Sequence, residues 1–116
     1  MKLAGYSLSL LVLTTSALAQ SQAEMNREAA ADFAKADAAL NKMYTKVLAA
    51  LDDEGKKKLK AAQRAWVVFR DAEADLQADS EARGGSLAPL IYDNTRTTLT
   101  NERIKAFKEM LKNSER

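Results

Sequence analysis

The residues of this chain that could perform acid–base chemistry are its carboxylates, because the 116-residue sequence contains no histidine and no cysteine. Imidazole catalysis, thiolate nucleophiles, disulfides and the usual Cys/His zinc sites are therefore excluded. Asp71, Glu73 and Asp75 lie close in sequence, but successive odd positions of a helix diverge in direction, and no aromatic platform for a sugar accompanies them. We interpret them as a solvated acidic face, and we predict that the protein is not an enzyme and uses no metal or cofactor.

The size and composition of the chain fit one small all-α domain. Hydrophobic residues make up 47% and charged residues 29% of the sequence, with 18 Lys+Arg against 16 Asp+Glu. This nearly neutral balance gives no indication of nucleic-acid binding. Only four glycines and one proline interrupt the chain, which favours long helices over a turn-rich β fold.

The first nineteen residues are typical of a secretory signal peptide. Lys2 gives a positive start, an apolar run follows from Leu3 to Leu13, and Ala17 and Ala19 occupy the small-residue positions of a cleavage site. A retained membrane anchor is the alternative, but the apolar run falls short of the roughly 20 residues that span a membrane. The pattern predicts a signal peptide over residues 1–19, cleavage before Gln20, and a periplasmic or secreted domain over residues 20–116.

Apolar residues recur at intervals of three and four in three segments, which predicts three helices. In the first segment Ser21 and Glu24 fit a capping box, and Asp52–Gly55 provides a turn to a second helix that we expect to pack on the first. The predicted stripes are Met25, Ala29, Phe33, Ala36, Leu40, Met43, Val47 and Leu51; then Leu59, Ala62, Trp66, Phe69, Glu73 and Leu76; then Leu87, Leu90, Ile91, Thr98, Ile104, Phe107 and Leu111.

The third segment begins after a glycine pair. Gly84 and Gly85 permit a turn, Ser86 is a candidate cap, and Pro89 lies in the first helical turn, where its missing N–H is harmless. Four threonines between Asp93 and Thr100 lower helix propensity, so both a continuous helix and a kink there remain open. Together the segments predict a three-helix antiparallel bundle built on a long helical hairpin.

An antiparallel arrangement would separate charge along the bundle. Residues 24–37 and 71–83 hold nine acidic and three basic residues, a net charge of −6, whereas residues 42–60 and 103–116 hold eleven basic and five acidic residues, a net charge of +6. The second helix would begin with lysines and end among Asp75, Asp79 and Glu81, the reverse of what a helix dipole favours. One interpretation is ordinary solvated faces; the other is an acidic end that binds a cationic partner.

A polar seam is expected across the hairpin. Asp37, Asn41 and Tyr44 share one face of the first helix, and an antiparallel second helix would place Arg70 opposite Asp37 and Gln63 opposite Tyr44. In the structural interpretation Arg70 pairs with Asp37 or Asp71 and fixes the register of the helices. In the functional one, Arg70 and Trp66 form a hot spot for a partner. The apolar stripe favours core packing for Trp66.

Four motifs in the same order resemble the LprI-like family of small exported bacterial proteins. They are Ala36-Asp37-x-x-Leu40-Asn41-x-x-Tyr44; Leu59-x-x-Ala62-Gln63-Arg64-x-Trp66-x-x-Phe69-Arg70-Asp71; Gly84-Gly85-Ser86; and Thr100-x-x-Arg103. The resemblance covers about two-thirds of the predicted mature chain, which is more specific than any single motif. Members of this family usually carry cysteines near the positions of Glu28, Ala74 and Thr95, so any disulfide that they use is absent here.

The resemblance implies an all-helical exported domain, and the family takes its name from a member that inhibits lysozyme. We therefore expect a binding protein whose partner is a basic lysozyme, with the acidic end and the Gly84–Gly85 loop covering the enzyme's cleft. The alternative is a non-catalytic structural or stress-related periplasmic protein whose lysine-rich end makes weak contacts with the envelope. The candidate interaction residues are Asp37, Asn41, Tyr44, Gln63, Arg64, Trp66, Arg70, Asp71, Gly84, Gly85, Ser86 and Arg103, with Asp75, Asp79 and Glu81 at the acidic end.

Overall fold

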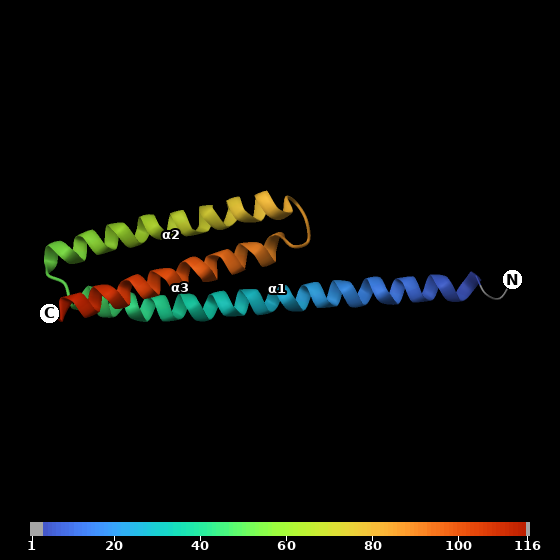
Figure 1. Ribbon diagram of the computed structural model, residues 1–116, viewed down its shortest axis with the longest axis horizontal. Helices are drawn as coiled ribbons and strands as arrows, with labels where there is room; N and C mark the ends of the chain where they lie inside the picture. The colour runs from blue at the N-terminus through green and yellow to red at the C-terminus, as the bar shows by residue number, and fades with distance from the viewer. Residues whose placement is uncertain (1–3, 116) are drawn as a thin grey trace.

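The protein is a bundle of three helices, as a computed structural model describes for residues 4–115, with side chains from residue 16 onward. The helices are α1 (Ala4–Ala49), α2 (Asp53–Ala82) and α3 (Ala88–Ser114). Successive helices run in opposite directions, and α1 extends well beyond the other two (Figure 1). The predicted all-α antiparallel bundle is confirmed. Over this part of the chain, no helix has both the length and the apolar character that crossing a membrane requires.

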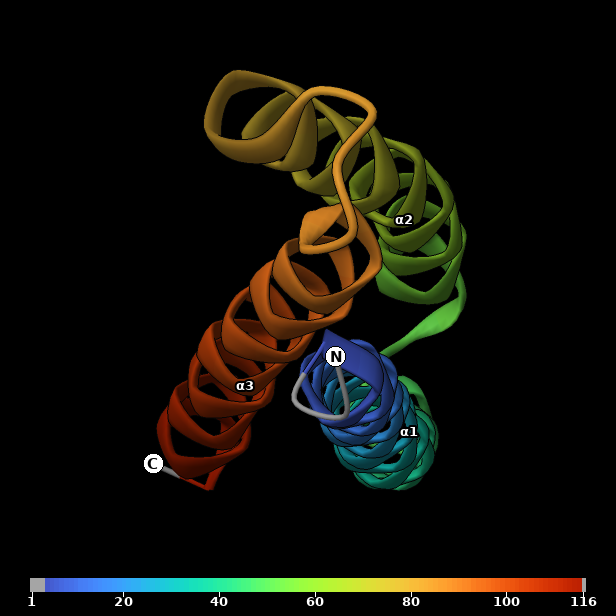
Figure 2. The same cartoon turned by 90° about the vertical axis from the view of Figure 1, so that its right-hand side faces the viewer.

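The third helix holds the bundle together. It packs along both α1 and α2, whereas α1 and α2 approach each other at few points. The two views agree that α3 lies beside both of the other helices (Figures 1 and 2). The expectation that α2 packs mainly on α1 is therefore wrong. Large apolar side chains on α3, such as Phe107, fill the space between α1 and α2. These two helices therefore do not pack against each other along their length, as the helices of a two-helix hairpin would.

Helix α1 does not begin at Ser21. It runs without a break from Ala4, so backbone N–H groups near Ser21 find carbonyl partners in the preceding turn and a capping box is not needed there. The positive start of the predicted signal peptide, Met1 and Lys2, lies outside the described residues. The turn to α2 is shorter than the predicted Asp52–Gly55, because α2 already begins at Asp53 and includes Gly55. The expected capping carboxylate is present: Asp52 accepts a 2.8 Å hydrogen bond from the backbone N–H of Gly55.

The buried face of α1 follows the predicted stripe, but that of α2 does not. On α1, Ala29, Ala36, Leu40 and Val47 are buried, and only Met25 of the stripe is exposed. On α2 the buried residues are Leu59, Arg70, Ala74 and Ala78, while Ala62, Phe69 and Leu76 are exposed. Trp66 packs against the core but is only partly buried. The predicted stripe is wrong for α2 because packing buries an arginine and small alanines on this helix and leaves its largest apolar residues exposed or only partly buried.

Helix α3 is continuous through its threonine-rich segment. The Thr95 hydroxyl donates to the Ile91 carbonyl at 2.8 Å and the Thr98 hydroxyl to the Asn94 carbonyl at 3.1 Å, so these side chains bond along the helix instead of breaking it. Pro89 lies in the first turn as expected, but the cap position belongs to Leu87, with no side-chain hydrogen bond, and not to Ser86. Thr98 and Leu87, predicted in the apolar stripe, are exposed.

Candidate functional site

A buried arginine joins all three helices at the middle of the bundle. The side chain of Arg70, only 6% exposed, donates to Asp71 at 2.9 Å, to Asp37 of α1 at 3.3 Å and to the Thr100 hydroxyl of α3 at 3.4 Å. The predicted pairing with Asp37 or Asp71 is confirmed for both carboxylates. Charge-assisted hydrogen bonds from one guanidinium to three partners fix the register of the helices.

Arginines and aromatic rings alternate along the bundle on either side of this position. The Arg70 guanidinium carbon lies 4.9 Å from the centre of the Phe33 ring and 5.2 Å from that of Trp66. Arg96 lies 3.6 Å from the centre of Phe33, and Arg103 lies 5.5 Å from that of Trp66. We call this series the arginine ladder: Tyr92, Arg96, Phe33, Arg70, Trp66, Arg103 and Phe107.

The ladder follows one face of α3, and sequence reasoning found only part of it. Tyr92, Arg96, Arg103 and Phe107 are spaced by four, seven and four residues, a helical spacing that could have indicated a shared face. Periodicity places Phe33 in the apolar stripe of the first helix, but it does not identify Arg96, because a charged residue does not count toward such a stripe. Arg96 is held further by a 2.6 Å ion pair with Asp93.

The surroundings of Tyr92, Arg103 and Arg83 shift the pKa of each of these side chains from its ordinary value. Burial raises the pKa of the Tyr92 phenol, an effect that the nearby Arg96 charge opposes. Burial lowers the pKa of the Arg103 guanidinium, which donates a 3.0 Å hydrogen bond to the Gln63 side-chain oxygen. Hydrogen bonding to Asp79 raises the pKa of Arg83. Arginine keeps its proton at neutral pH despite such shifts, so Arg83 and Arg103 act as fixed cations.

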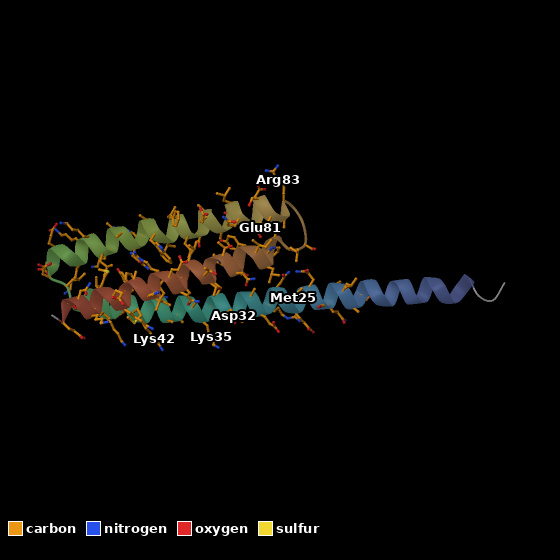
Figure 3. All side chains as sticks on the ribbon, in the orientation of Figure 1. Met25, Asp32, Lys35, Lys42, Glu81 and Arg83 are labelled. Carbon is orange, nitrogen blue, oxygen red and sulfur yellow. The ribbon has the colours of Figure 1, made fainter. Side chains whose placement is uncertain are left out.

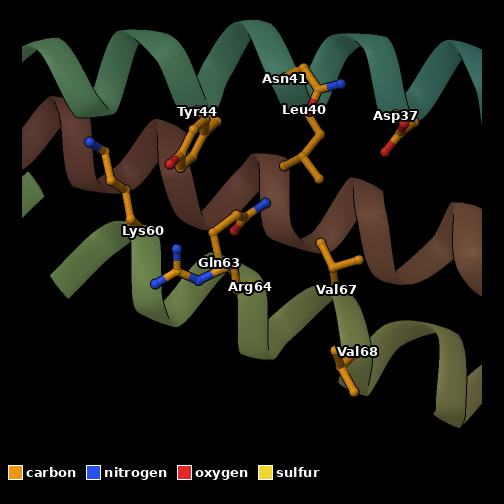
Figure 4. Close-up of a pocket in the computed structure, with 9 residues that line it drawn as sticks. All are labelled: Asp37, Leu40, Asn41, Tyr44, Lys60, Gln63, Arg64, Val67 and Val68. Atoms are coloured by element: carbon orange, nitrogen blue, oxygen red, sulfur yellow. The ribbon is translucent and has the colours of Figure 1, made fainter. Parts of the chain in front are cut away.

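The motif residues of α1 and α2 line a groove between the two helices. Its volume is about 480 Å³, and α3 passes behind it (Figure 4). The predicted neighbours Tyr44 and Gln63 both line it, although the Gln63 side chain bonds to Arg103 and not to Tyr44. The residues that line it are Asp37, Leu40, Asn41, Tyr44, Lys60, Gln63, Arg64, Val67 and Val68. Six of the residues in the family-like motifs thus meet at one surface.

The acidic runs of α1 and α2 gather at one end of the bundle, beside the loop between α2 and α3 (Figure 3). Asn94 of α3 lines one hollow with Glu28 and Asp32 of α1, and another with Glu73 of α2, which places the two runs on either side of α3. We call this surface the acidic end, and it comprises Glu24, Glu28, Asp32, Glu73, Asp75, Asp79 and Glu81. All except the half-buried Glu73 are exposed.

The loop at the acidic end turns at a glycine in the left-handed region. Gly84 has φ +64°, a conformation that side-chain-bearing residues rarely adopt, and the Gly85 N–H closes the turn by donating to the Ala82 carbonyl at 2.8 Å. Gly84, Gly85 and Ser86 are all exposed. The loop and Arg103, which both belong to the family-like motifs, therefore lie in different parts of the bundle.

The described part of the chain offers exposed surfaces for binding. Among residues 4–115, no cluster of histidine, cysteine, aspartate or glutamate has the arrangement needed to hold a metal ion. The arginines of the ladder stack on its aromatic rings and bond to Asp37, Asp71, Asp93, Gln63 and Thr100, and only the Arg96 Nε is buried without a hydrogen-bond partner among them. The groove and the acidic end are among the exposed features that a partner could contact.

Comparison with known proteins places the chain among helical proteins of one family. The family model described as lysozyme inhibitor LprI matches residues 14–107. The chain is also 37% identical over 110 residues to a protein of Rhizobium meliloti (strain 1021) described as uncharacterized protein R02472, an alignment that covers 84% of this chain and 78% of that one. No solved structure matches the chain.

Proposed function

The chain belongs to the LprI family of lysozyme inhibitors, and on that premise we propose that it is an exported, non-catalytic protein that inhibits a basic lysozyme by covering the enzyme's cleft with the acidic end. The observation that carries this proposal is the convergence of two acidic runs. Glu28 and Asp32 of α1 are distant in sequence from Glu73, yet both groups flank Asn94.

Electrostatics gives this end a mechanism. A concentrated negative surface attracts a cationic enzyme during diffusion and raises the association rate, and it orients the two molecules before contact. The exposed loop at Gly84 lies at the tip of this end, where it is free to enter a concave surface. The inhibitor would then act by occlusion alone.

Export is the cellular context in which such an inhibitor would meet lysozyme. The apolar segment up to Leu13 and the small residues Ala17 and Ala19 support a signal peptide that is cut before Gln20. Cleavage would remove the part of α1 that projects beyond the other helices and leave the acidic end in place.

The test is association with lysozyme over a series of salt concentrations. Reversing Glu28, Asp32 and Glu81 to lysine should slow association about tenfold at low salt and flatten its salt dependence, because steering acts on the on-rate. The matched control reverses Lys105, Lys108 and Lys112 of α3 to glutamate at the other end of the bundle, where all three are exposed. It should bind at least as fast as the parent.

Two results would contradict the proposal. One is a parent protein that neither binds nor inhibits lysozyme. The other is equal association rates for the two triple variants, which would mean that the acidic end has no particular role.

A second candidate function is contact with the envelope through the opposite end. Exposed lysines of α1, α2 and α3 gather there, among them Lys46, Lys57, Lys58 and Lys108. Such a cluster would bind anionic lipid or cell-wall polymer in a salt-sensitive way. Binding of anionic vesicles by the parent, lost in the Lys105, Lys108 and Lys112 variant, would support this function independently of lysozyme.

A further inference from the structure

The outward face of α2 is apolar although neither α1 nor α3 covers it. Val68 is 70% exposed, Phe69 54% and Leu76 58%. The exposed alanines Ala61, Ala65 and Ala72 share this face at helical spacing, and it points away from the buried residues of the same helix. Three large apolar side chains in a row on a solvent-facing helix are typical of an interface.

The charges along the same face form a self-complementary series. Near the start of α2, Glu54 and Lys58 form an exposed pair at 3.8 Å, and near its end Asp79 and Arg83 form another at 2.8 Å. Read along the helix, the face carries an acid and a base, then the apolar residues, then an acid and a base. Read from the other end of the helix, the same face carries a base where the first reading has an acid, and an acid where it has a base. Each charge of one copy would therefore meet an opposite charge on an antiparallel second copy.

We propose that this face is the interface of a symmetric homodimer in which α2 packs antiparallel on α2 of a second copy, with the two-fold axis between Val68 and Phe69. Residues whose numbers sum to 137 then face each other. The facing pairs, one residue from each copy, are Val68 and Phe69, Ala65 and Ala72, Ala61 and Leu76, Lys58 and Asp79, and Glu54 and Arg83.

Each pair in this arrangement is favourable. The apolar residues meet at the centre, the small alanines let the helices approach closely, and the intrahelical pairs Glu54–Lys58 and Asp79–Arg83 of the two copies merge into a four-charge cluster at each end. An isologous interface requires this kind of self-complementarity. A 30-residue helix is about 45 Å long, which offers a contact along most of the bundle.

The antiparallel dimer also accounts for the acidic C-terminal end of α2. The first turn of this helix holds Asp53 and Glu54, which match its dipole, so the predicted lysine start is wrong; only Asp79 and Glu81 near the C-terminus oppose the dipole. In the dimer, Lys57 and Lys58 of one copy lie beside the negative end of the other copy's helix. A partner of one charge sign, such as a basic enzyme or an anionic membrane, would be attracted by one residue of each charged pair and repelled by the other.

The first experiment measures molecular mass by sedimentation over a wide range of concentration, without lysozyme. The parent should be a concentration-dependent dimer. Phe69→Lys should make the protein monomeric at concentrations where the parent is dimeric, with an unchanged helical circular dichroism spectrum, because Phe69 is not part of the core. The matched control is Met110→Lys, which changes an exposed apolar residue on α3, outside the proposed interface, and should leave the dimer intact.

The second experiment tests the antiparallel register. Lys58→Glu and Asp79→Lys should each weaken dimerisation about tenfold, because symmetry places two like-charge contacts in every dimer. Mixing the two variants should restore it. In the mixed dimer the glutamate introduced at position 58 of one copy faces the lysine introduced at position 79 of the other, and the remaining cluster keeps its native pair. Recovery in the mixture is expected only if the two α2 helices pair antiparallel in this register.

Several outcomes would overturn the proposal. They are a parent that is monomeric at every concentration, a Phe69→Lys variant that dimerises like the parent, and a mixture no more dimeric than its components. A monomeric parent that loses vesicle or lysozyme binding on Phe69→Lys would assign the face to that other partner. The triple variant at Glu28, Asp32 and Glu81 should dimerise normally, so failure of the lysozyme proposal would leave this one standing.

Discussion

The two halves of the bundle are packed by different means. Toward the lysine-rich end the core consists of Leu40, Val47, Leu59 and Phe107, with further apolar side chains around them. Toward the acidic end the buried apolar residues are alanines, namely Ala29, Ala36, Ala74 and Ala78. There the space between helices is filled by Arg70 and Arg96 stacked on aromatic rings.

This difference shows two ways for a small domain to become ordered without disulfides. Large apolar side chains supply transfer free energy but tolerate several packings of similar volume. Guanidinium groups bury less apolar surface, yet the hydrogen bonds of Arg70 to α1 and α3 are directional and are satisfied in one register only. The apolar half therefore contributes most of the stability, and the arginine half specifies which residues face each other.

The largest expected effect is in the apolar half. Phe107 is fully buried, so Phe107→Ala should lower the free energy of unfolding by about 3–5 kcal/mol, the usual cost of removing a core aromatic side chain. Urea unfolding followed by circular dichroism would measure it. A loss below about 1 kcal/mol would mean that this half does not carry the stability.

Arg70→Ala should cost somewhat less, about 3 kcal/mol, because it leaves unpaired two carboxylates that are themselves 40% and 39% exposed. Arg70→Met, which keeps most of the volume, should recover part of the loss and yet broaden the amide resonances as the register loosens. Lys42→Ala, at an exposed site of α1 outside the proposed interface, should change stability by less than about 0.5 kcal/mol. Equal unfolding midpoints for Arg70→Ala and Lys42→Ala would remove the structural role assigned to the ladder.

The smallest expected effect is a change in stability at alkaline pH, and it concerns Tyr92 in the arginine half. Burial raises the pKa of Tyr92, so above its ordinary value of about 10 the unfolded chain loses the phenol proton first. The stability contributed by the neutral phenol is therefore present below that pH and is lost as the pH rises through the folded pKa. Tyr92→Phe should show a shallower alkaline loss of stability than the parent, measured as unfolding midpoints in the same buffers, and parallel curves would contradict this.

The sequence was sufficient for the number of helices, the glycine turn before α3 and the pairing of Arg70, but not for the start of α1 or the cap of α3. Periodicity places Leu40 and Val47 in the core, and the antiparallel register brings Asp37 to Arg70, because both follow from helix geometry alone. The buried face of α2 could not be predicted in the same way. Hydrophobicity favours Phe69 and Leu76, but contact with α3 buries Arg70 and Ala74 instead.

The position of α3 explains this difference. A stripe shows which side of a helix is apolar, but it does not show which neighbour covers that side. Helix α2 has apolar residues on two sides, and its packing on α3 decides which of them is inside. The remaining side is the one that we assign to a second copy.

The separation of charge along the bundle gives the molecule a large permanent electric dipole, with a net charge of −6 over residues 24–37 and 71–83 and +6 over residues 42–60 and 103–116. Two copies joined by the antiparallel two-fold axis proposed above would carry opposed dipoles, which cancel along the length of the bundle. A single copy therefore turns in an external electric field with its lysine-rich end toward negative charge, whereas the dimer has no preferred orientation.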